Sequence, residues 1–305
     1  MNVRNKRKKM QSYREFLYIL PFILLVAVFA YYPLYGWIYA FYDYKPPQPL
    51  DMAHPTLKWF KSMVDTDVKV KEILRVMKNT FAISGLNLIF SWFPMIFAVF
   101  LNEIKCKPFK KFVQTVTTLP NFVSWVLVFA IAYNVFSTTG VVNQVLMTLG
   151  LEATPKAFLQ SDEHIWFKMW LWNTWKNAGW AAIMYIAAIT GIDEELMEAA
   201  RVDGANRMQV IRYITIPQIL PTYFVLVMLS VANFLSNGFE QFYVFQNSFN
   251  KESIEVLDLY VYNTTFGAGG YSLGIAISIL KTIVSMVLLV ASNKFSKKIR
   301  GEGFI

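Results

Sequence analysis

The sequence contains little charge, one cysteine and two histidines. Charged residues make up 16% of its 305 positions and hydrophobic residues 55%, whereas soluble domains average about 25% and 45–50%. The single cysteine, Cys106, excludes a disulfide within these residues, and we interpret it as an incidental thiol rather than a reactive one. His54 and His164 stand alone in segments that we expect to be outer loops, so the sequence offers no histidine-centred metal site.

Sequence motifs of catalysis and nucleic-acid binding are also missing. No glycine is followed directly by lysine, which excludes the phosphate-binding loop G-x-x-x-x-G-K-[ST]. We therefore expect no enzyme activity and no bound cofactor in this chain, and if ATP drives its function, the ATP and Mg²⁺ belong to a partner. The net charge of +9 comes from basic segments that flank apolar runs, which suits contact with membrane lipid and gives no sign of nucleic-acid binding.

What the sequence does contain is long hydrophobic runs. About 20 apolar residues in a helix cross the hydrocarbon core of a membrane, and continuous runs of that length indicate helices rather than barrel strands. The first run is too long for a secretory signal, so we interpret it as an uncleaved anchor. The sequence predicts an all-α integral membrane protein with six transmembrane helices, at 17–42, 80–101, 112–136, 167–190, 217–239 and 271–293.

The distribution of lysine and arginine between the loops predicts the orientation of these helices. Basic residues resist translocation, so the loops that are rich in them stay in the cytoplasm. With the N-terminus inside, the cytoplasmic segments carry seventeen basic residues and the outer segments carry ten. We expect a basic cytoplasmic N-terminal segment at 1–16, a six-helix transmembrane domain at 17–293 and a cytoplasmic C-terminal tail at 294–305.

The segment 191–216, between the fourth and fifth predicted spans, has the pattern of two short cytoplasmic helices. Asp193 can cap the first helix, whose apolar face extends to Val202. Gly204 stops this helix, and a second helical stretch follows and ends at Pro217. A helix pair of this kind under the membrane suits insertion into a groove of a partner protein.

The same segment resembles the coupling motif of permease subunits from binding-protein-dependent ABC importers. A Glu-Ala-Ala triplet alone is common in helices, but this one lies between two spans on the basic side, in register with a glycine and a proline. The one departure is Ile216, where leucine is commoner. The motif has its complete spacing here, in Glu198-Ala199-Ala200, Gly204 and Ile214-Thr215-Ile216-Pro217.

Four further segments resemble the oligosaccharide branch of this family, the LplB-like and YteP-like sugar permeases. The resemblance covers nearly the whole chain and implies the MetI-like permease fold with its coupling helix pair. The segments that carry it are Tyr32-Pro33-Leu34-Tyr35-Gly36, Asn79-Thr80, Leu119-Pro120-Asn121-Phe122-Val123-Ser124-Trp125 and Trp175-Lys176-Asn177-Ala178-Gly179-Trp180.

The resemblance implies a multi-pass protein of the bacterial cytoplasmic membrane with both termini in the cytoplasm. The chain would form half of a translocation pathway for a carbohydrate, with a different six-helix permease as the other half. Two cytoplasmic ATPase subunits or domains would hold ATP and Mg²⁺, and an extracytoplasmic binding protein would deliver the sugar. Coupling to the ATPase would then fall to Glu198, Ala199, Ala200, Asp203, Gly204 and Pro217.

Two predicted spans carry polar or aromatic residues at helical spacing, i, i+4, i+7 in the fourth and i, i+3, i+7 in the fifth. At bilayer depth such side chains meet other protein or a water-filled cavity, and interhelical hydrogen bonding is the alternative to sugar contact. Both sets fall where maltose-type permeases line their sugar pathway. The predicted substrate pathway consists of Phe122, Asn173, Asn177, Trp180, Ser230, Asn233 and Asn237.

Two lysines lie deep inside predicted spans, whereas Lys168 is at the outer edge of the fourth. Lys176 would meet an anionic sugar, snorkel toward the outer interface or form a structural pair, and we favour the last two. The sequence names no partner for Lys281. Outside the spans, residues 57–78 are expected to form an amphipathic helix on the outer surface.

Two other functions remain open. Importers of non-sugar solutes share the coupling motif, and a binding assay with the partner binding protein separates the two. An ATP-independent channel or carrier usually has carboxylates inside the membrane, whereas the six predicted spans contain no Asp or Glu.

Overall fold

The computed structural model describes residues 3–152 and 154–300, and all regular secondary structure in that part of the chain is helical. Five helical stretches in it are long and apolar enough to cross a membrane, and each overlaps a different predicted span. The fourth predicted span falls in α8 (Ile165–Thr190), a continuous helix of 26 residues that polar side chains make less apolar than those five. The five stretches are Glu15–Phe41, Asp67–Asn102, Trp125–Thr148, Arg207–Ala232 and Tyr271–Lys298.

The chain divides into two compact units. The first comprises the residues up to Thr66 and the segment Asn263–Leu280. In it the Ser272 hydroxyl donates to the carbonyl oxygen of Tyr42 at 2.8 Å and accepts from the backbone N–H of Tyr44 at 3.1 Å. Its helices are α1 (Val3–Val26), η1 (Ala27–Tyr31), η2 (Tyr32–Phe41), α2 (Lys58–Lys61), η5 (Asn263–Gly267) and the first turns of α15 (Tyr271–Arg300).

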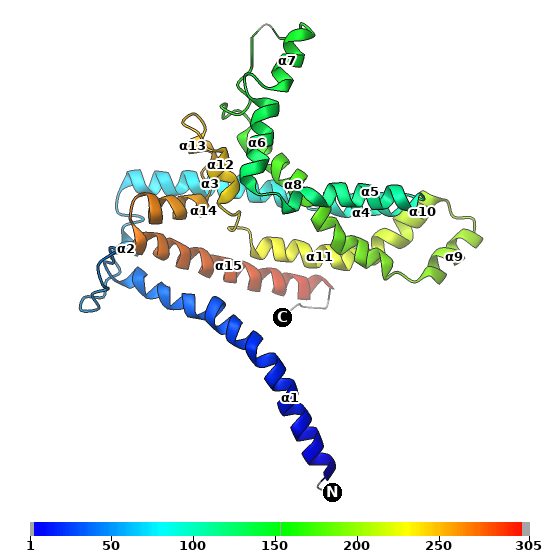
Figure 1. Cartoon of the computed structure of the whole chain (residues 1–305), viewed down its shortest axis with the longest axis horizontal. Coiled ribbons are helices and arrows are strands. Elements are labelled where there is room, and N and C mark those ends of the chain that lie inside the picture. The colour runs from blue at the N-terminus through cyan, green and yellow to red at the C-terminus, as the bar shows by residue number, and fades with distance from the viewer. Residues whose placement is uncertain (1–2, 153, 301–305) are drawn as a thin grey trace. The chain divides into compact units, whose positions relative to one another are not determined.

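The second unit contains most of the helices (Figure 1). Helices α3, α4, α5 and α11 all pack against α8. Its further elements are α3 (Asp67–Ile89), α4 (Phe93–Asn102), α5 (Lys107–Thr118), η3 (Leu119–Phe122), α6 (Trp125–Phe136), α7 (Val141–Thr148), α9 (Glu194–Val202), α10 (Arg207–Val210), η4 (Ile211–Thr215), α11 (Ile216–Ala232), α12 (Glu240–Phe245), α13 (Lys251–Ile254), α14 (Leu257–Tyr262) and the rest of α15.

In the described part of this second unit, two apolar clusters of the core lie near the two ends of α8. Ile165 and Met169 of α8 belong to the first cluster, with residues of α3, α6 and α12 to α14. Ala182, Tyr185 and Ile189 belong to the second, with residues of α4 and α11. The stretch of α8 between these clusters carries the polar residues, so both ends of α8 are fixed by apolar packing and its middle is left for polar contacts.

The predicted span 112–136 and the predicted surface helix 57–78 are wrong as single helices. Helix α5 ends at Thr118, and the short η3 segment separates it from α6. Pro120 has no N–H for a helical hydrogen bond, and Ser124 caps a new helix by accepting from Leu127 N, so the chain stops and restarts here. Within 57–78, only the four residues of α2 and the first turns of α3 are helical.

Pro217 does not end the second coupling helix, contrary to the sequence-based expectation. One helical stretch runs from Arg207 to Ala232, and Pro217 lies in the first turn of α11 within it. The π-helical turn η4 directly precedes α11 and ends two residues before the proline. Local π adjustments of this kind satisfy backbone groups that a proline leaves without a donor, so the helix continues.

The predicted span 217–239 is too long at its other end. Helix α11 ends at Ala232, and residues 233–239 form an irregular loop before α12.

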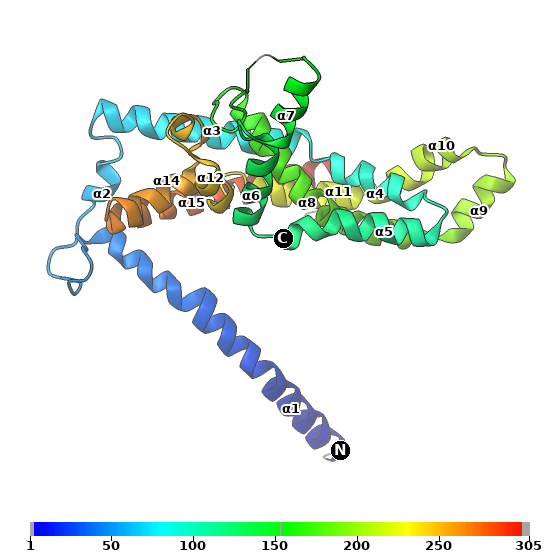
Figure 2. The ribbon, with the colours of Figure 1, turned by 45° about the horizontal axis from the view of Figure 1, so that its top comes forward.

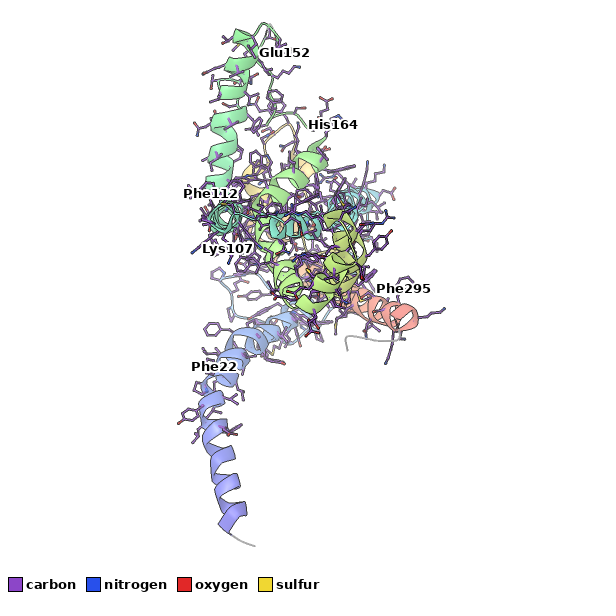
Figure 3. All side chains as sticks on the ribbon, turned by 90° about the vertical axis from the view of Figure 1, so that its right-hand side faces the viewer. Phe22, Lys107, Phe112, Glu152, His164 and Phe295 are labelled. Atoms are coloured by element: carbon purple, nitrogen blue, oxygen red, sulfur yellow. The ribbon has the colours of Figure 1, made fainter. Side chains whose placement is uncertain are left out.

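In Figure 3, α5 is seen near Lys107 and Phe112, while Glu152 and His164 lie away from it on the side of α7. The segment around α7 therefore projects from the helices that pack on α8.

Candidate functional site

A cavity of about 460 Å³ lies inside the second unit, between α3, α8, α11 and the loop 233–239. The residues that line it are uncharged. Its walls combine apolar side chains with amides and hydroxyls that come from every one of these elements, among them Ser84, Asn87, Asn173, Asn177, Ser230 and Asn237. The site is therefore suited to a neutral polar ligand more than to a metal ion or an oxidation–reduction cofactor.

Four asparagines form a chain of hydrogen bonds along one side of the cavity. Asn121 Nδ2 donates to Asn177 Oδ1 at 2.8 Å, Asn177 Nδ2 donates to Asn173 Oδ1 at 2.7 Å, and Asn173 Nδ2 donates to Asn87 Oδ1 at 3.3 Å. The chain links η3, α8 and α3. Because an amide group carries two N–H donors and two acceptor lone pairs, each member retains capacity for a ligand hydroxyl.

The loop 233–239 forms another side of the cavity and is tied to α3. Asn237 Nδ2 donates to Ser84 Oγ at 2.9 Å, and the Ser84 hydroxyl donates to the carbonyl oxygen of Phe234. Ser230 and Asn233 instead donate to carbonyl oxygens one turn back in α11, each at 2.9 Å. These two side chains thus satisfy the end of their own helix while they line the cavity.

The structure brings five of the seven predicted pathway residues to this one cavity. Asn173, Asn177, Ser230, Asn233 and Asn237 all line it, although the last two lie beyond the end of α11 and not on a helical face as predicted.

Phe122 and Trp180 lie outside the lining. Their rings pack edge to face with centroids 5.6 Å apart, and the two side chains are 71% and 51% exposed. Helical spacing and the family resemblance placed Trp180 with Asn173 and Asn177, but Ala178 and Ala181 line the cavity at that turn.

Several polar residues at the site were missed by the sequence analysis, among them Ser84, Asn87 and Asn121. Ser84 and Asn87 line the cavity from α3, and Asn121 completes the amide chain from η3. Ser84, Asn87 and Ser91 are spaced i, i+3, i+7, which is the signal that was used for the fifth span and not applied to the second. No helical periodicity could have found Asn121, because η3 interrupts the helix there.

Lys176 behaves as a structural pair and not as a snorkelling residue. Its side chain is buried, with 7% exposed, and its Nζ donates to the carbonyl oxygen of Asn121 at 2.7 Å. The same Nζ lies 5.5 Å from the ring centroid of Trp125, within range of a cation–π contact. Lys176 therefore fastens α8 to the break between α5 and α6 and does not line the cavity.

The predicted coupling segment forms two short helices at one end of the second unit (Figure 2). Asp193 caps α9 by accepting from Glu195 N at 3.0 Å, as the sequence indicated. Gly204 then has φ +80°, a left-handed conformation that other residues adopt at a cost. Asn206 and Gln209 form a capping box that starts α10.

The outward surface of this segment contains both charged and apolar side chains. Glu198, Ala199 and Asp203 are exposed and Ala200 is half-buried. Four large apolar side chains are also exposed, Leu196, Val202, Met208 and Tyr213. Arg207 forms an ion pair with Glu103 at 3.7 Å, which connects α10 to the end of α4. The segment is therefore an amphipathic surface held at a fixed place on the helical unit.

Long apolar helices around a neutral polar cavity, with a pair of exposed short helices at one end, define a membrane transport component. Among the described residues, no group of three or more His, Cys, Asp or Glu is arranged to hold a metal ion. The family described as "Binding-protein-dependent transport system inner membrane component" matches residues 91–301, and the chain belongs to this family. It is a permease component of an ABC transporter and not the catalytic component.

Relatives and solved structures extend the likeness over almost the whole chain. The chain is 33% identical to protein LplB of Bacillus subtilis, covering 94% of this chain and 90% of LplB. It is 34% identical to the B. subtilis polygalacturonan/rhamnogalacturonan transport system permease protein YteP, covering 98% and 94%.

Two crystal structures of a bacterial alginate ABC transporter each contain a similar chain. One, a transporter involved in the import of the acidic polysaccharide alginate, matches with TM-score 0.83 and 31% identity over 97% of this chain and 99% of that one. The other, in complex with a periplasmic protein bound to alginate pentasaccharide, matches with TM-score 0.84 and 31% identity over 97% and 98%.

Proposed function

We propose that this chain forms half of the translocation pathway of an oligosaccharide importer, and that the cavity lined by Asn173, Asn177 and Asn237 is its solute-contacting part. The observation that carries the proposal is the cavity itself, which is neutral, lined by amides and hydroxyls, and placed between the helices of the membrane unit. Its volume of about 460 Å³ lies within the range of roughly 300–1,000 Å³ typical of ligand sites.

The chemistry of the lining suits a carbohydrate. Each sugar hydroxyl exchanges hydrogen bonds with water for hydrogen bonds with protein, and an amide offers both a donor and an acceptor for that exchange. The apolar part of the wall, such as Leu88 and Val227, suits the C–H faces of a sugar ring. The cavity is lined by one chain, and a different six-helix permease would supply the facing wall.

The names of the similar proteins support a carbohydrate over other solutes. YteP is named for polygalacturonan and rhamnogalacturonan, and the solved transporter imports alginate. Importers of non-sugar solutes remain the alternative, since they share the coupling motif. An ATP-independent carrier is less well supported, because the chain presents an exposed coupling segment.

The proposed topology has six spans, with α8 as the fourth. Helix α8 is 26 residues long, or about 39 Å at ~1.5 Å per residue, which exceeds the ~30 Å of the hydrocarbon core. Its polar middle faces the cavity and its apolar ends pack on other helices, so it needs less hydropathy than a span that faces lipid. The transmembrane domain is then 17–293, between cytoplasmic ends at 1–16 and 294–305 in a bacterial cytoplasmic membrane.

The proposed partner of the coupling segment is a cytoplasmic ATPase. Glu198, Ala199, Ala200, Asp203 and Gly204 lie on or beside the exposed helix α9, where a groove of the ATPase can receive them. Pro217 acts indirectly, at the start of α11. Two ATPase subunits or domains would bind ATP and Mg²⁺, and an extracytoplasmic binding protein would deliver the sugar.

Reconstitution in proteoliposomes tests this function. The chain is co-expressed with its neighbouring permease, ATPase and binding protein, and ATP hydrolysis and uptake are measured with neutral oligosaccharides, uronate oligosaccharides and amino acids. We expect uptake and stimulated ATP hydrolysis with one of the two carbohydrate classes only. Stimulation by an amino acid alone, or uptake without ATP, would overturn the proposal.

A further inference from the structure

The loop 233–239 has a second attachment, at Gly238, directly after the residue Asn237 that binds Ser84. The backbone N–H of Gly238 donates to Asp258 Oδ2 at 2.8 Å. One residue further on, the ring of Phe239 stacks on that of Tyr262, with centroids 4.6 Å apart and planes 8° apart. Asp258 and Tyr262 both belong to α14, so this short helix holds the loop immediately after the cavity residue Asn237.

Helix α14 is itself fixed to α3 and to its own flank. The backbone N–H of Leu257, the first residue of α14, donates to the Thr80 hydroxyl at 2.9 Å. Glu255, just before it, forms an ion pair with Arg75 of α3 at 2.8 Å. Asp258 therefore projects from a helix whose starting point is anchored by two contacts with α3.

Lys281, for which the sequence names no partner, binds the other carboxylate oxygen of Asp258. Lys281 Nζ of α15 forms an ion pair with Asp258 Oδ1, and the two side chains are only 19% and 17% exposed. A carboxylate with one oxygen held by an ammonium group presents its second oxygen in a fixed direction. Here that second oxygen accepts the Gly238 N–H.

We propose that Asp258 is a positioning residue of the transport pathway. Lys281 orients its carboxylate, and the carboxylate holds the Gly238 backbone so that Ser236 and Asn237 stay in the cavity wall. This inference rests on the proposed function, because the loop matters for transport only if the cavity carries solute. The ion pair by itself is weak evidence for stability, and the role assigned to it is orientation.

Two double variants isolate the hydrogen bond from the ion pair. Asp258→Asn with Lys281→Met removes both charges but keeps an acceptor oxygen for Gly238. Asp258→Leu with Lys281→Met removes both charges and the acceptor, and keeps the number and branching of the side-chain heavy atoms at position 258. Asp258→Glu provides a third variant that keeps both charges and displaces the carboxylate by one methylene, in case the leucine variant does not assemble.

The first measurement reports the loop and does not require transport. Ser236→Cys is introduced with Cys106→Ser, which removes the one native thiol, and the reaction rate of the cysteine with a maleimide is measured in the purified complex. We expect the leucine and glutamate variants to react at least threefold faster than the parent, and the asparagine variant to stay within twofold of it.

The second measurement is the substrate concentration for half-maximal uptake, in variants that retain Ser236, with complex recovery and melting temperature recorded for each. We expect a rise of about tenfold in the leucine variant and less than threefold in the asparagine variant. Equal maleimide rates in the two double variants would overturn the inference. Different rates in a complex whose parent takes up no carbohydrate would leave the positioning role standing and reject the proposed function.

Discussion

The cavity and the coupling segment are built by different kinds of contact. The amide chain of the cavity joins residues that are distant in sequence, such as Asn121 with Asn177 and Asn173 with Asn87. The coupling segment is set by contacts between near neighbours, Asp193 with Glu195 and Asn206 with Gln209. The difference teaches that substitutions at the contacts between helices in the cavity should change stability and transport together, whereas substitutions in the coupling segment should change transport alone.

The largest effect is expected where α8 meets α5. A Cβ at Gly179 would lie 2.1 Å from the carbonyl oxygen of Thr117, which is backbone and cannot rotate away. Gly179→Val should therefore cost about 3 kcal/mol, the upper end for overpacked sites, and sharply lower recovery of the complex. Melting of the purified complex measures it. Gly85→Ala is the control, because no atom outside its chain neighbours and its own helix backbone lies within 4 Å of the added Cβ, and an equal loss in both variants would contradict the packing argument.

A substitution in the amide chain comes next. Asn177→Leu leaves the Asn121 N–H group and the Asn173 oxygen without their partner, which should cost about 2 kcal/mol and raise the substrate concentration for half-maximal uptake. Asn233→Ala sharpens the comparison, because its side chain donates to Leu229 of its own helix. It should shift stability by less than about 0.5 kcal/mol and still weaken uptake. Thermal melting and uptake kinetics on both variants test this. Unchanged melting for Asn177→Leu would show that the amide chain does not stabilise the fold.

The turn of the coupling segment should separate stability from transport. Gly204→Val places a β-branched residue at φ +80°, a conformation that costs about 1–2 kcal/mol for residues other than glycine. We expect the exposed turn to rearrange rather than retain this strain, so that uptake falls about tenfold and becomes uncoupled from ATP hydrolysis, with membrane insertion and melting retained. Gly204→Asn is the control, since asparagine tolerates the left-handed region. Normal uptake by the valine variant would count against the docking model.

The smallest effect is expected at Glu198. It is exposed, and an exposed ion pair contributes ~0–1 kcal/mol, so Glu198→Ala should weaken binding of the ATPase subunit at most about fivefold. Val202, with 87% of its side chain exposed, offers apolar area that docking would bury. Val202→Ser should weaken binding more than Glu198→Ala does, and affinities measured in detergent decide the order. If Glu198→Ala weakened binding more than Val202→Ser, charge and not apolar contact would supply most of the docking energy.

The same difference explains how much the sequence could predict. The cap at Asp193, the end of α9 near Val202 and the turn at Gly204 depend on residues within one helical turn, and all were predicted. Five of the six spans match long apolar helices because hydropathy is summed over many residues. The break at Pro120 depends on a missing N–H group and on the Ser124 cap. Hydropathy reports neither of these features, nor the end of α11 at Ala232.

Side-chain partners across helices were the hardest to foresee. The partner of Lys281 was missed because Asp258 lies in a short helix, α14, and no long hydrophobic run in the sequence predicts that helix. Asn173 and Asn177 were placed at the site by spacing, but their partners Asn87 and Asn121 follow from which helices pack on α8. Spacing gives the face of a helix and not the identity of what that face meets.

The continuous helical stretch Arg207–Ala232 can also transmit a movement from one of its ends to the other. Because Pro217 does not interrupt it, one rod joins the surface beside Gly204 to the cavity residue Ser230. The distance along this rod from Arg207 to Ser230 is about 35 Å at ~1.5 Å per residue, so a tilt of about 10° at one end displaces the other by about 6 Å. That displacement is comparable to the width of a sugar ring, so under the proposed function a small rotation at the end that carries the coupling segment would be enough to open or close the cavity wall.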